Sequence, residues 1–235
     1  MKVLIVGGSG GVGLAMVKQL IEDDTIDTVY ATFRQRRPLL SHPKLNWFLV
    51  DVCDEAQIEH LSQTISQLDW VINTVGLLHD DTHQPEKRLA QLDSAFFLRS
   101  MQTNALATLL LAKHLQPLLM KSKQPKFASL SARVGSISDN RLGGWYSYRA
   151  SKAALNMTIK TLSIEWSRIK PSSCVFALHP GTTDTALSKP FQSNVPEGKL
   201  FSPERVARQL LAIVSQADEQ LSGEFFAYDG TRIEW

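Results

Sequence analysis

The sequence is poor in cysteine and carries little net charge. Of its 235 residues only Cys53 and Cys174 are cysteines, and they lie far apart, outside any Cys-x-x-Cys pattern. This excludes a disulfide framework and favours a reducing, cytoplasmic location. The net charge of +2 is too small to indicate nucleic acid or an anionic membrane as the main partner.

Long apolar runs are also missing. The first run, Val3 to Val6, is four residues long and is followed by glycine, so it is too short for a signal-peptide core. No stretch approaches the roughly 20 apolar residues that span a bilayer, and we expect no membrane partner. With 43% hydrophobic and 20% charged residues, the composition instead predicts a globular protein with a sizeable core.

Short apolar runs alternate with helical patterns along the whole chain. Strands are expected at 3–6, 28–33, 46–50, 70–73, 126–130, 173–178 and 224–228. Helices are expected up to residue 21 and at 55–67, 92–120, 148–168 and 203–216. This alternation predicts an α/β fold, a Rossmann-type doubly wound parallel sheet of about seven strands with helices on both faces. Because no linker or repeat interrupts the pattern, residues 1–235 are expected to form a single domain.

The first strand runs directly into a glycine-rich turn and then into a helix. Gly7, Gly11 and Gly13 leave room for a tight turn and for a pyrophosphate to approach the free N–H groups at the helix N-terminus. A flexible turn is the alternative, but the position between an opening strand and a helix favours a nucleotide site. The expected dinucleotide contacts in this turn are Gly7, Ser9, Gly10, Gly11, Val12 and Gly13.

The second strand ends at Phe33, about 20 residues after the last glycine. An NAD site places Asp or Glu there to hold the ribose 2′-hydroxyl, whereas this chain has Arg34, followed by Arg36 and Arg37. A guanidinium binds a 2′-phosphate through charge-assisted hydrogen bonds. The sequence therefore predicts that NADP(H) is preferred over NAD(H), with Arg34 contacting the phosphate. The alternative is a solvated arginine loop, and the glycine turn itself contributes no basic residue.

Tyr148 and Lys152 form a Tyr-x-x-x-Lys pattern at the start of a strongly helical stretch. Residues four apart on a helix share one face, so the phenol and the ammonium are expected side by side. A nearby cation lowers the pKa of a phenol, which gives an acid or base that works near neutral pH. Alone, such a pair is more often part of a solvated helix face. Whether it is catalytic has to be judged from the other motifs of the chain.

Several motifs stand in one order along the chain: the Gly7-x-x-x-Gly11-x-Gly13 turn, Asn104, Ser131 and Tyr148-x-x-x-Lys152. In this combination the chain resembles the short-chain dehydrogenase/reductase family over essentially its whole length. The stretches 131–137 and 143–149 and the ending 228–235 are most similar to the branch of C-factor-like signalling proteins and sniffer-type carbonyl reductases.

The resemblance implies a role for each of four catalytic residues. Tyr148 is expected to be the acid/base, and Lys152 to lower its pKa and to hold the nicotinamide ribose. Ser131 is expected to hydrogen-bond the substrate carbonyl, with Ser129 as a rival inside the preceding strand. Asn104 is expected to hold a proton-relay water near the lysine; alone, it reads as a core amide or a kink.

The resemblance also implies further cofactor contacts at the ends of later strands. Asp51 and Val52 are expected at the adenine, although Asp is also a common helix N-cap. The segment after the sixth strand is expected at the nicotinamide carboxamide. Together with the glycine turn, Arg34, Tyr148 and Lys152, the expected cofactor-binding residues are Asp51, Val52, Asn73, Thr74, Gly76, Pro180, Gly181, Thr183 and Thr185.

The chain departs from the family pattern at a few positions. Val6 replaces the usual Thr before the first glycine, and Thr74 and Val75 replace Asn and Ala. Seventeen positions separate Ser131 from Tyr148, more than is usual in the family. This spacing indicates a longer loop at the rim of the site.

These observations favour an NADP-dependent oxidoreductase that acts on a small carbonyl or alcohol substrate. The alternative is a C-factor-like signalling protein that binds the dinucleotide but turns over little; the complete Asn–Ser–Tyr–Lys set argues against it. By resemblance, apolar positions such as Leu109, Leu155 and Ile159 are expected to be exposed and would allow an isologous homodimer. The segment 186–200 is expected to line the substrate pocket.

Histidines offer only weaker candidates for a site. His79 and His83 are four apart, but they lie in a polar loop without a helical pattern, and we expect no metal site there. His179 precedes Pro180 at a strand end and is expected to be structural or near the substrate rather than a base.

Overall fold

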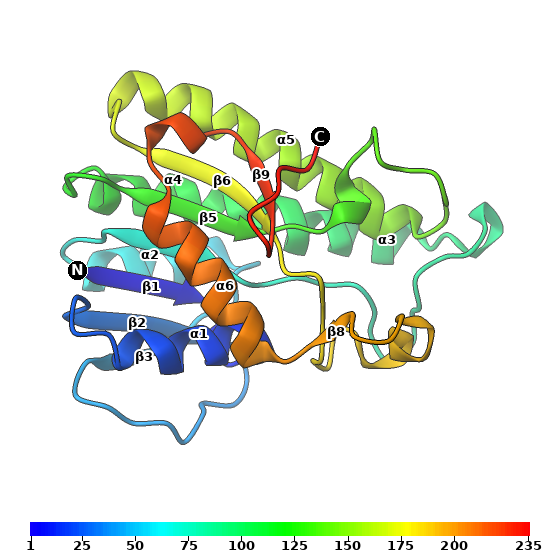
Figure 1. Cartoon of the computed structure of the whole chain (residues 1–235), viewed down its shortest axis with the longest axis horizontal. Coiled ribbons are helices and arrows are strands. Elements are labelled where there is room, and N and C mark those ends of the chain that lie inside the picture. Colours follow the sequence, from blue (N-terminus) through cyan, green and yellow to red (C-terminus); the bar gives the residue numbers. More distant parts are fainter.

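The protein is described by a computed structural model that covers residues 1–235, except for the side chain of Asn194. Seven parallel strands form one sheet, in the order β3-β2-β1-β4-β5-β6-β9 (Figure 1). This confirms the predicted fold class. The strands are β1 (Lys2–Val6), β2 (Thr28–Phe33), β3 (Leu45–Leu49), β4 (Trp70–Asn73), β5 (Lys126–Leu130), β6 (Cys174–His179) and β9 (Phe225–Ala227).

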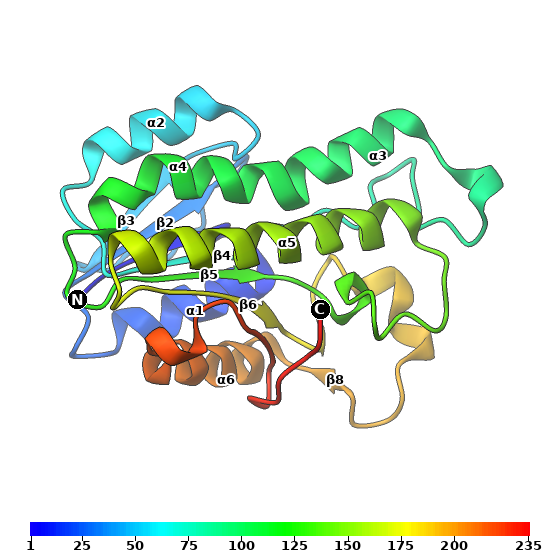
Figure 2. The same ribbon diagram turned by 90° about the horizontal axis from the view of Figure 1, so that it is seen from above.

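Helices cover both faces of the sheet. Figure 2 shows α1 (Gly11–Ile21) and α6 (Pro203–Gln216) on one face, and α2 (Glu55–Thr64), α4 (Ala107–Leu119) and α5 (Tyr146–Ile169) on the other. Successive residues of a strand point to opposite faces. Val3 and Ile5 of β1 therefore join one core cluster, and Leu4 and Val6 join the other.

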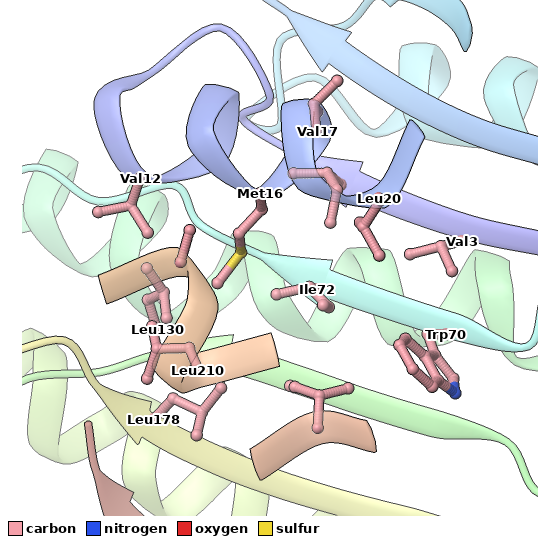
Figure 3. Packing of buried hydrophobic residues seen from close by; sticks show 14 of the residues in the cluster. Val3, Val12, Met16, Val17, Leu20, Trp70, Ile72, Leu130, Leu178 and Leu210 are labelled. Atoms are coloured by element: carbon pink, nitrogen blue, oxygen red, sulfur yellow. The ribbon is translucent and has the colours of Figure 1, made fainter. Parts of the chain in front are cut away.

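The first cluster packs α1 and α6 together against the sheet. In Figure 3, Met16 and Leu20 of α1 and Leu210 of α6 lie over Ile72 and Leu130 of neighbouring strands. On the opposite face, Leu155 and Ile159 of α5 are 1% and 0% exposed. The expectation that these two residues are exposed is therefore wrong, because they lie on the face of α5 that covers the sheet. Leu109 is exposed as expected, at 41%.

The long helix expected over 92–120 is interrupted near its middle. α3 (Ser94–Met101) passes into a π-helical turn (Gln102–Leu106) before α4 begins. Such a turn widens a helix locally and is often found at functional sites. Its sequence pattern is indistinguishable from α-helix, so the chain alone could not reveal it.

The connection from β6 to α6 contains short elements that the sequence did not predict. β7 (Thr182–Thr183) pairs with β8 (Leu200–Phe201) in a second, two-stranded parallel sheet, and a 3₁₀ helix (Lys189–Asn194) lies between them (Figure 1). Segments this short have no usable hydrophobic period.

Among the residues that the structure describes, no helix has the length and apolar character needed to cross a bilayer.

Candidate active site

The glycine turn after β1 is too tight for side chains. Gly7 has φ +80°, and a Cβ atom there would lie 2.8 Å from Thr74 Oγ1; a Cβ on Gly13 would overlap the Gly7 carbonyl oxygen. Gly10 is the N-cap of α1 and provides no capping side chain. The first N–H groups of α1 therefore receive no side-chain cap from Gly10, at the point where the sequence predicts a pyrophosphate.

The segment after β6 lies against the same turn. A Cβ on Gly11 would come within 2.5 Å of Thr185 Cγ2, so the two segments touch. Gly181 has φ +69°, and a Cβ there would meet the Tyr228 ring. Thr183 is 5% exposed, and its hydroxyl donates to the Pro180 carbonyl oxygen at 3.3 Å. The topology thus brings the glycine turn and the predicted carboxamide segment together at one edge of the sheet.

Two cavities lie beside the end of β2. The first, of about 660 Å³, is lined by Ser9 and by residues of the Arg34–Leu39 segment. The second, of about 520 Å³, is lined by Arg34, Gln35, Leu49, Asp51, Gln57 and Arg99. Arg34 lines both cavities, and the sequence predicts that it contacts the phosphate.

Arg99 is a cavity-lining residue that the sequence did not single out. Its Nη1 donates to Asp80 Oδ2 at 2.8 Å, which ties α3 to the loop after β4. Asp80 also accepts from the backbone N–H groups of Thr82 and His83, and these bonds outweigh burial and lower the pKa of its carboxyl group. In the sequence, Arg99 is a lone arginine on an amphipathic helix. Nothing in that pattern indicates that it lines the same cavity as Asp51.

Several predicted cofactor contacts use their side chains inside the protein. Asn73 Nδ2 donates to Thr108 Oγ1 at 3.0 Å and to Ser129 Oγ at 3.3 Å, while its Oδ1 accepts from Val75 N. Thr74 Oγ1 donates to the Val6 carbonyl oxygen at 2.8 Å. These bonds fasten the end of β4 to its neighbours and occupy both side chains inside the protein.

The first residues after β3 differ in what they contact. Asp51 Oδ1 accepts from Cys53 N at 2.9 Å and Asp51 lines the second cavity. The N-cap of α2 is Asp54, not Asp51, and its carboxylate accepts from Ala56 N and Gln57 N. Val52 is 5% exposed and belongs to the core. Asp51 is thus left at the cavity wall, where the sequence expects the adenine.

Tyr148 and Lys152 lie side by side in the first turns of α5, as predicted. Both are buried, and Lys152 Nζ lies 5.8 Å from the centre of the Tyr148 ring. Nζ donates to the Leu130 carbonyl oxygen at the end of β5, at 2.8 Å. Burial lowers the pKa of Lys152 to about 7.

The pKa of Tyr148 shifts in the direction opposite to the expected one. Burial raises it above its ordinary value, because the charged phenolate loses solvation. The effect of the neighbouring lysine, on which the expectation of a lowered pKa was based, does not overcome this loss. In the free protein the phenol therefore keeps its proton at neutral pH.

Asn104 lies in the π-helical turn and faces the same region. Its Oδ1 accepts from Leu77 N at 2.7 Å, and its Nδ2 donates to the Leu77 carbonyl oxygen and to Ser151 Oγ, both at 2.8 Å. A Cβ on Gly76 would lie 3.5 Å from Lys152 Nζ and 3.7 Å from Asn104 Oδ1. Asn104, Gly76 and Lys152 are therefore close neighbours.

Ser131 follows β5 and is 3% exposed. Its hydroxyl donates to Asn156 Oδ1 on α5 at 2.6 Å, and within the described residues no hydrogen bond joins it to Tyr148. Asn156 Nδ2 has no hydrogen-bond partner among the described residues. The rival Ser129 is fully buried in β5 and accepts from Asn73, so it does not reach the site.

Aromatic rings from three separate segments gather beside Tyr148. The Trp145 ring lies 6.2 Å from the Tyr148 ring and 5.3 Å from the Phe191 ring, between ring centres. His79 lies 5.6 Å from Phe191, and its Nε2 contacts the Leu187 carbonyl oxygen at 3.1 Å. These contacts place part of the segment 186–200 next to the rings beside Tyr148, and the sequence predicts that this segment lines the substrate pocket.

His83 and His179 make structural contacts. His83 stacks on Phe96 at 4.7 Å and contacts Asp80. Among the described residues, no group of three His, Cys, Asp or Glu side chains could hold a metal ion. Burial lowers the pKa of His179 to about 4, so this histidine is neutral near pH 7 and its Nδ1 accepts from Arg133 N at 3.4 Å.

Known proteins share this sequence pattern and this fold. The family model for short chain dehydrogenase matches residues 1–196. A 1-hydroxy-2-glutathionyl-2-methyl-3-butene dehydrogenase from Rhodococcus sp. is 31% identical over 237 residues, which cover 99% of each chain. The C-signal protein of Myxococcus xanthus is 33% identical over 148 residues, which cover 63% of this chain and 83% of that protein.

Solved structures agree with this assignment. The carbonyl reductase Sniffer of D. melanogaster superposes with a TM-score of 0.88 at 25% identity, covering 100% of this chain and 99% of its own. An NADPH-bound carbonyl reductase from chicken fatty liver superposes with a TM-score of 0.87 at 25% identity, covering 100% and 94%. On its sequence, its sheet order and the arrangement of its glycine turn and Tyr148–Lys152 pair, this chain belongs to the short-chain dehydrogenase/reductase family.

Proposed function

We propose that the chain is an NADP-preferring carbonyl reductase, which transfers a hydride between NADP(H) and a carbonyl or alcohol substrate. The observation that carries this proposal is the buried Tyr148–Lys152 pair at the carboxyl end of β5. Ligands of open parallel sheets bind beyond this edge. The similarity to carbonyl reductases supports the same reaction class.

The residues present fit a nicotinamide dinucleotide. The glycine turn forms a cradle that Cβ atoms would fill, and the two cavities at Arg34 provide room beside it. When bound, the nicotinamide group supplies or accepts the hydride. Arg34 and its neighbours Arg36 and Arg37 line the first cavity, and no acidic residue does so; this composition favours a 2′-phosphate over a free 2′-hydroxyl.

Tyr148 is suited to give a proton to the substrate. Because burial raises its pKa, the phenol is neutral at pH 7 and can donate its proton to the carbonyl oxygen as the carbonyl carbon accepts the hydride. Lys152, whose pKa lies near 7, stabilises the phenolate that remains. Asn104 hydrogen-bonds Leu77 and Ser151 beside this pair. By resemblance to the family, it also holds the water that relays the proton to solvent.

Ser131 is proposed as the hydrogen-bond donor to the substrate oxygen. Its hydroxyl donates to Asn156 Oδ1. The proposed role therefore requires the hydroxyl to rotate away from Asn156 when a carbonyl arrives. The unpartnered Nδ2 group of Asn156 could then donate to the Ser131 oxygen if the amide turned over.

The second candidate function is dinucleotide-dependent signalling with little turnover, which the similarity to the C-signal protein favours. NADPH oxidation with a panel of aldehydes, ketones and quinones separates the two functions. Turnover that is lost in Tyr148→Phe supports the reductase. NADPH binding without turnover of any carbonyl supports the signalling protein.

A homodimer is proposed from the exposed apolar positions of α4 and α5, which lie on one face of the sheet (Figure 2). Leu109, Met157 and Ile164 are 41%, 68% and 47% exposed and would be covered in an isologous pair. Light scattering tests this proposal, because a mass near the 26.2 kDa of one chain would refute it.

A cytoplasmic location stays a prediction from the low cysteine content.

A further inference from the structure

The helix that carries Tyr148 begins without a capping side chain of its own. Gly143, Gly144 and Trp145 have φ values of +64°, +63° and +53°, so the chain enters α5 through three successive left-handed residues. Trp145 is the N-cap residue and makes no side-chain capping bond. The free N–H groups of the first turn therefore need an acceptor from another part of the chain.

Glu86 provides this acceptor from 61 residues earlier in the sequence. Its backbone oxygen accepts from Trp145 N at 2.5 Å, and its carboxylate accepts from Ser147 N at 3.2 Å and from the Ser147 hydroxyl. Glu86 is 3% exposed and Ser147 is 0% exposed, so water does not replace these bonds. The negative charge also lies where the dipole of α5 favours it.

These contacts are next to the proposed proton donor. Ser147 directly precedes Tyr148, and the Trp145 ring packs on the edge of the Tyr148 ring. Within the described residues no hydrogen bond holds the Tyr148 hydroxyl, so the direction of the phenol is set by the start of α5 and by packing. A side chain that fixes the first turn of α5 therefore fixes the phenol as well.

We propose that Glu86 is a positioning residue for Tyr148, which acts by capping α5 from outside and touches neither substrate nor cofactor. This inference rests on the proposed function, because it assigns Glu86 to the proton transfer of Tyr148. A merely structural cap would lower stability alone. A positioning cap also changes the environment of the phenol and the rate of the proton-transfer step in folded protein.

Two variants and one control separate these roles. Glu86→Ala removes both carboxylate bonds, whereas Glu86→Gln keeps an oxygen that can accept from Ser147 N. Ser202→Ala is the matched control, because Ser202 caps the remote helix α6 by accepting from Arg205 N. Thermal unfolding establishes that each variant is folded at the temperature of the assay.

The first readout is independent of turnover. In free protein labelled at the tyrosine ζ carbon, only four tyrosines give signals, and the Tyr148 signal is the one missing in Tyr148→Phe. We expect Glu86→Ala to shift or broaden this signal, Glu86→Gln to do so less, and Ser202→Ala to leave it unchanged. An unchanged Tyr148 signal in both folded Glu86 variants would overturn the proposal.

The second readout is kinetic. We expect Glu86→Ala to lower kcat by about tenfold or more with an NADPH Kd within about twofold of wild type, and Glu86→Gln to recover most of the rate. In a Tyr148→Phe background, Glu86→Ala should have no further effect on kcat. Wild-type kcat in folded Glu86→Ala would also overturn the proposal. If wild-type protein turns over no carbonyl, the reductase function fails, and the tyrosine signal alone decides on Glu86.

Discussion

Lys152 Nζ donates to the carbonyl oxygen of Leu130, at 2.8 Å, although both lie inside the protein. The bond connects the catalytic helix α5 to the last residue of β5. It partly offsets the cost of removing an ammonium group from water, a cost that is visible in the lowered pKa of about 7. The same burial that fixes the position of the Lys152 side chain thus destabilises its charged form.

This burial predicts a pH-dependent stability. An unfolded lysine titrates near 10.5 and the folded one near 7, so the penalty on folding is complete below pH 7 and declines as the pH rises towards 10.5. Relative to Lys152→Met, wild type should therefore gain roughly 1–4 kcal/mol of stability between pH 7 and 10. Urea unfolding at several pH values measures the difference in the free energy of unfolding between wild type and Lys152→Met. Parallel pH profiles of the two proteins would contradict the prediction.

Tyr148→Phe removes the proposed proton donor with little change in shape. We expect kcat to fall by about 100-fold or more, because general acid catalysis is lost. NADPH binding should stay within about twofold of wild type, since the phenol oxygen holds no other group in place in the described structure. Steady-state kinetics and calorimetry check both parts, and near-normal turnover would exclude the mechanism.

Arg34→Ala tests the preference for NADP(H). Losing a hydrogen bond to a charged group costs about 1.5–3 kcal/mol, so NADPH binding should weaken by about ten- to 150-fold while NADH binding hardly changes. Arg168→Ala, an exposed arginine near the end of α5, is the control for general charge effects. Calorimetric titration of both cofactors decides; equal losses for NADPH and NADH would show that Arg34 does not contact the phosphate.

Arg99→Ala should weaken both cofactors alike. Arg99 lines the cavity at Asp51 and not the cavity of Arg36 and Arg37, so we propose that its guanidinium would contact the adenine rather than the phosphate. A partly exposed cation–π contact contributes about 0.5–1 kcal/mol, which corresponds to a two- to fivefold loss. Asp80→Asn, which weakens the bond that orients Arg99, should give a smaller loss in the same titration. A loss confined to NADPH would assign Arg99 to the phosphate instead.

The sequence alone predicted the features that depend on local pattern. The strand β2 and the helix α6 with its Ser202 cap lie where expected, because apolar periodicity and capping residues act over a few positions. The glycine turn was predictable for the same reason, since only glycine fits the positive φ of Gly7 and the contact at Gly13. The spacing of Tyr148 and Lys152 similarly fixed their neighbourhood on α5.

The tertiary structure decided what those residues contact and how they titrate. The prediction that Asn73 lies at the cofactor did not say what its side chain contacts; the structure shows that it bonds to Thr108 and Ser129, 35 and 56 residues away. Leu155 faces the core rather than a partner. The Tyr148 pKa rises instead of falling, because desolvation depends on every element packed around the ring. The Glu86 cap joins residues 61 positions apart, and no local pattern encodes which distant acceptor completes a helix end.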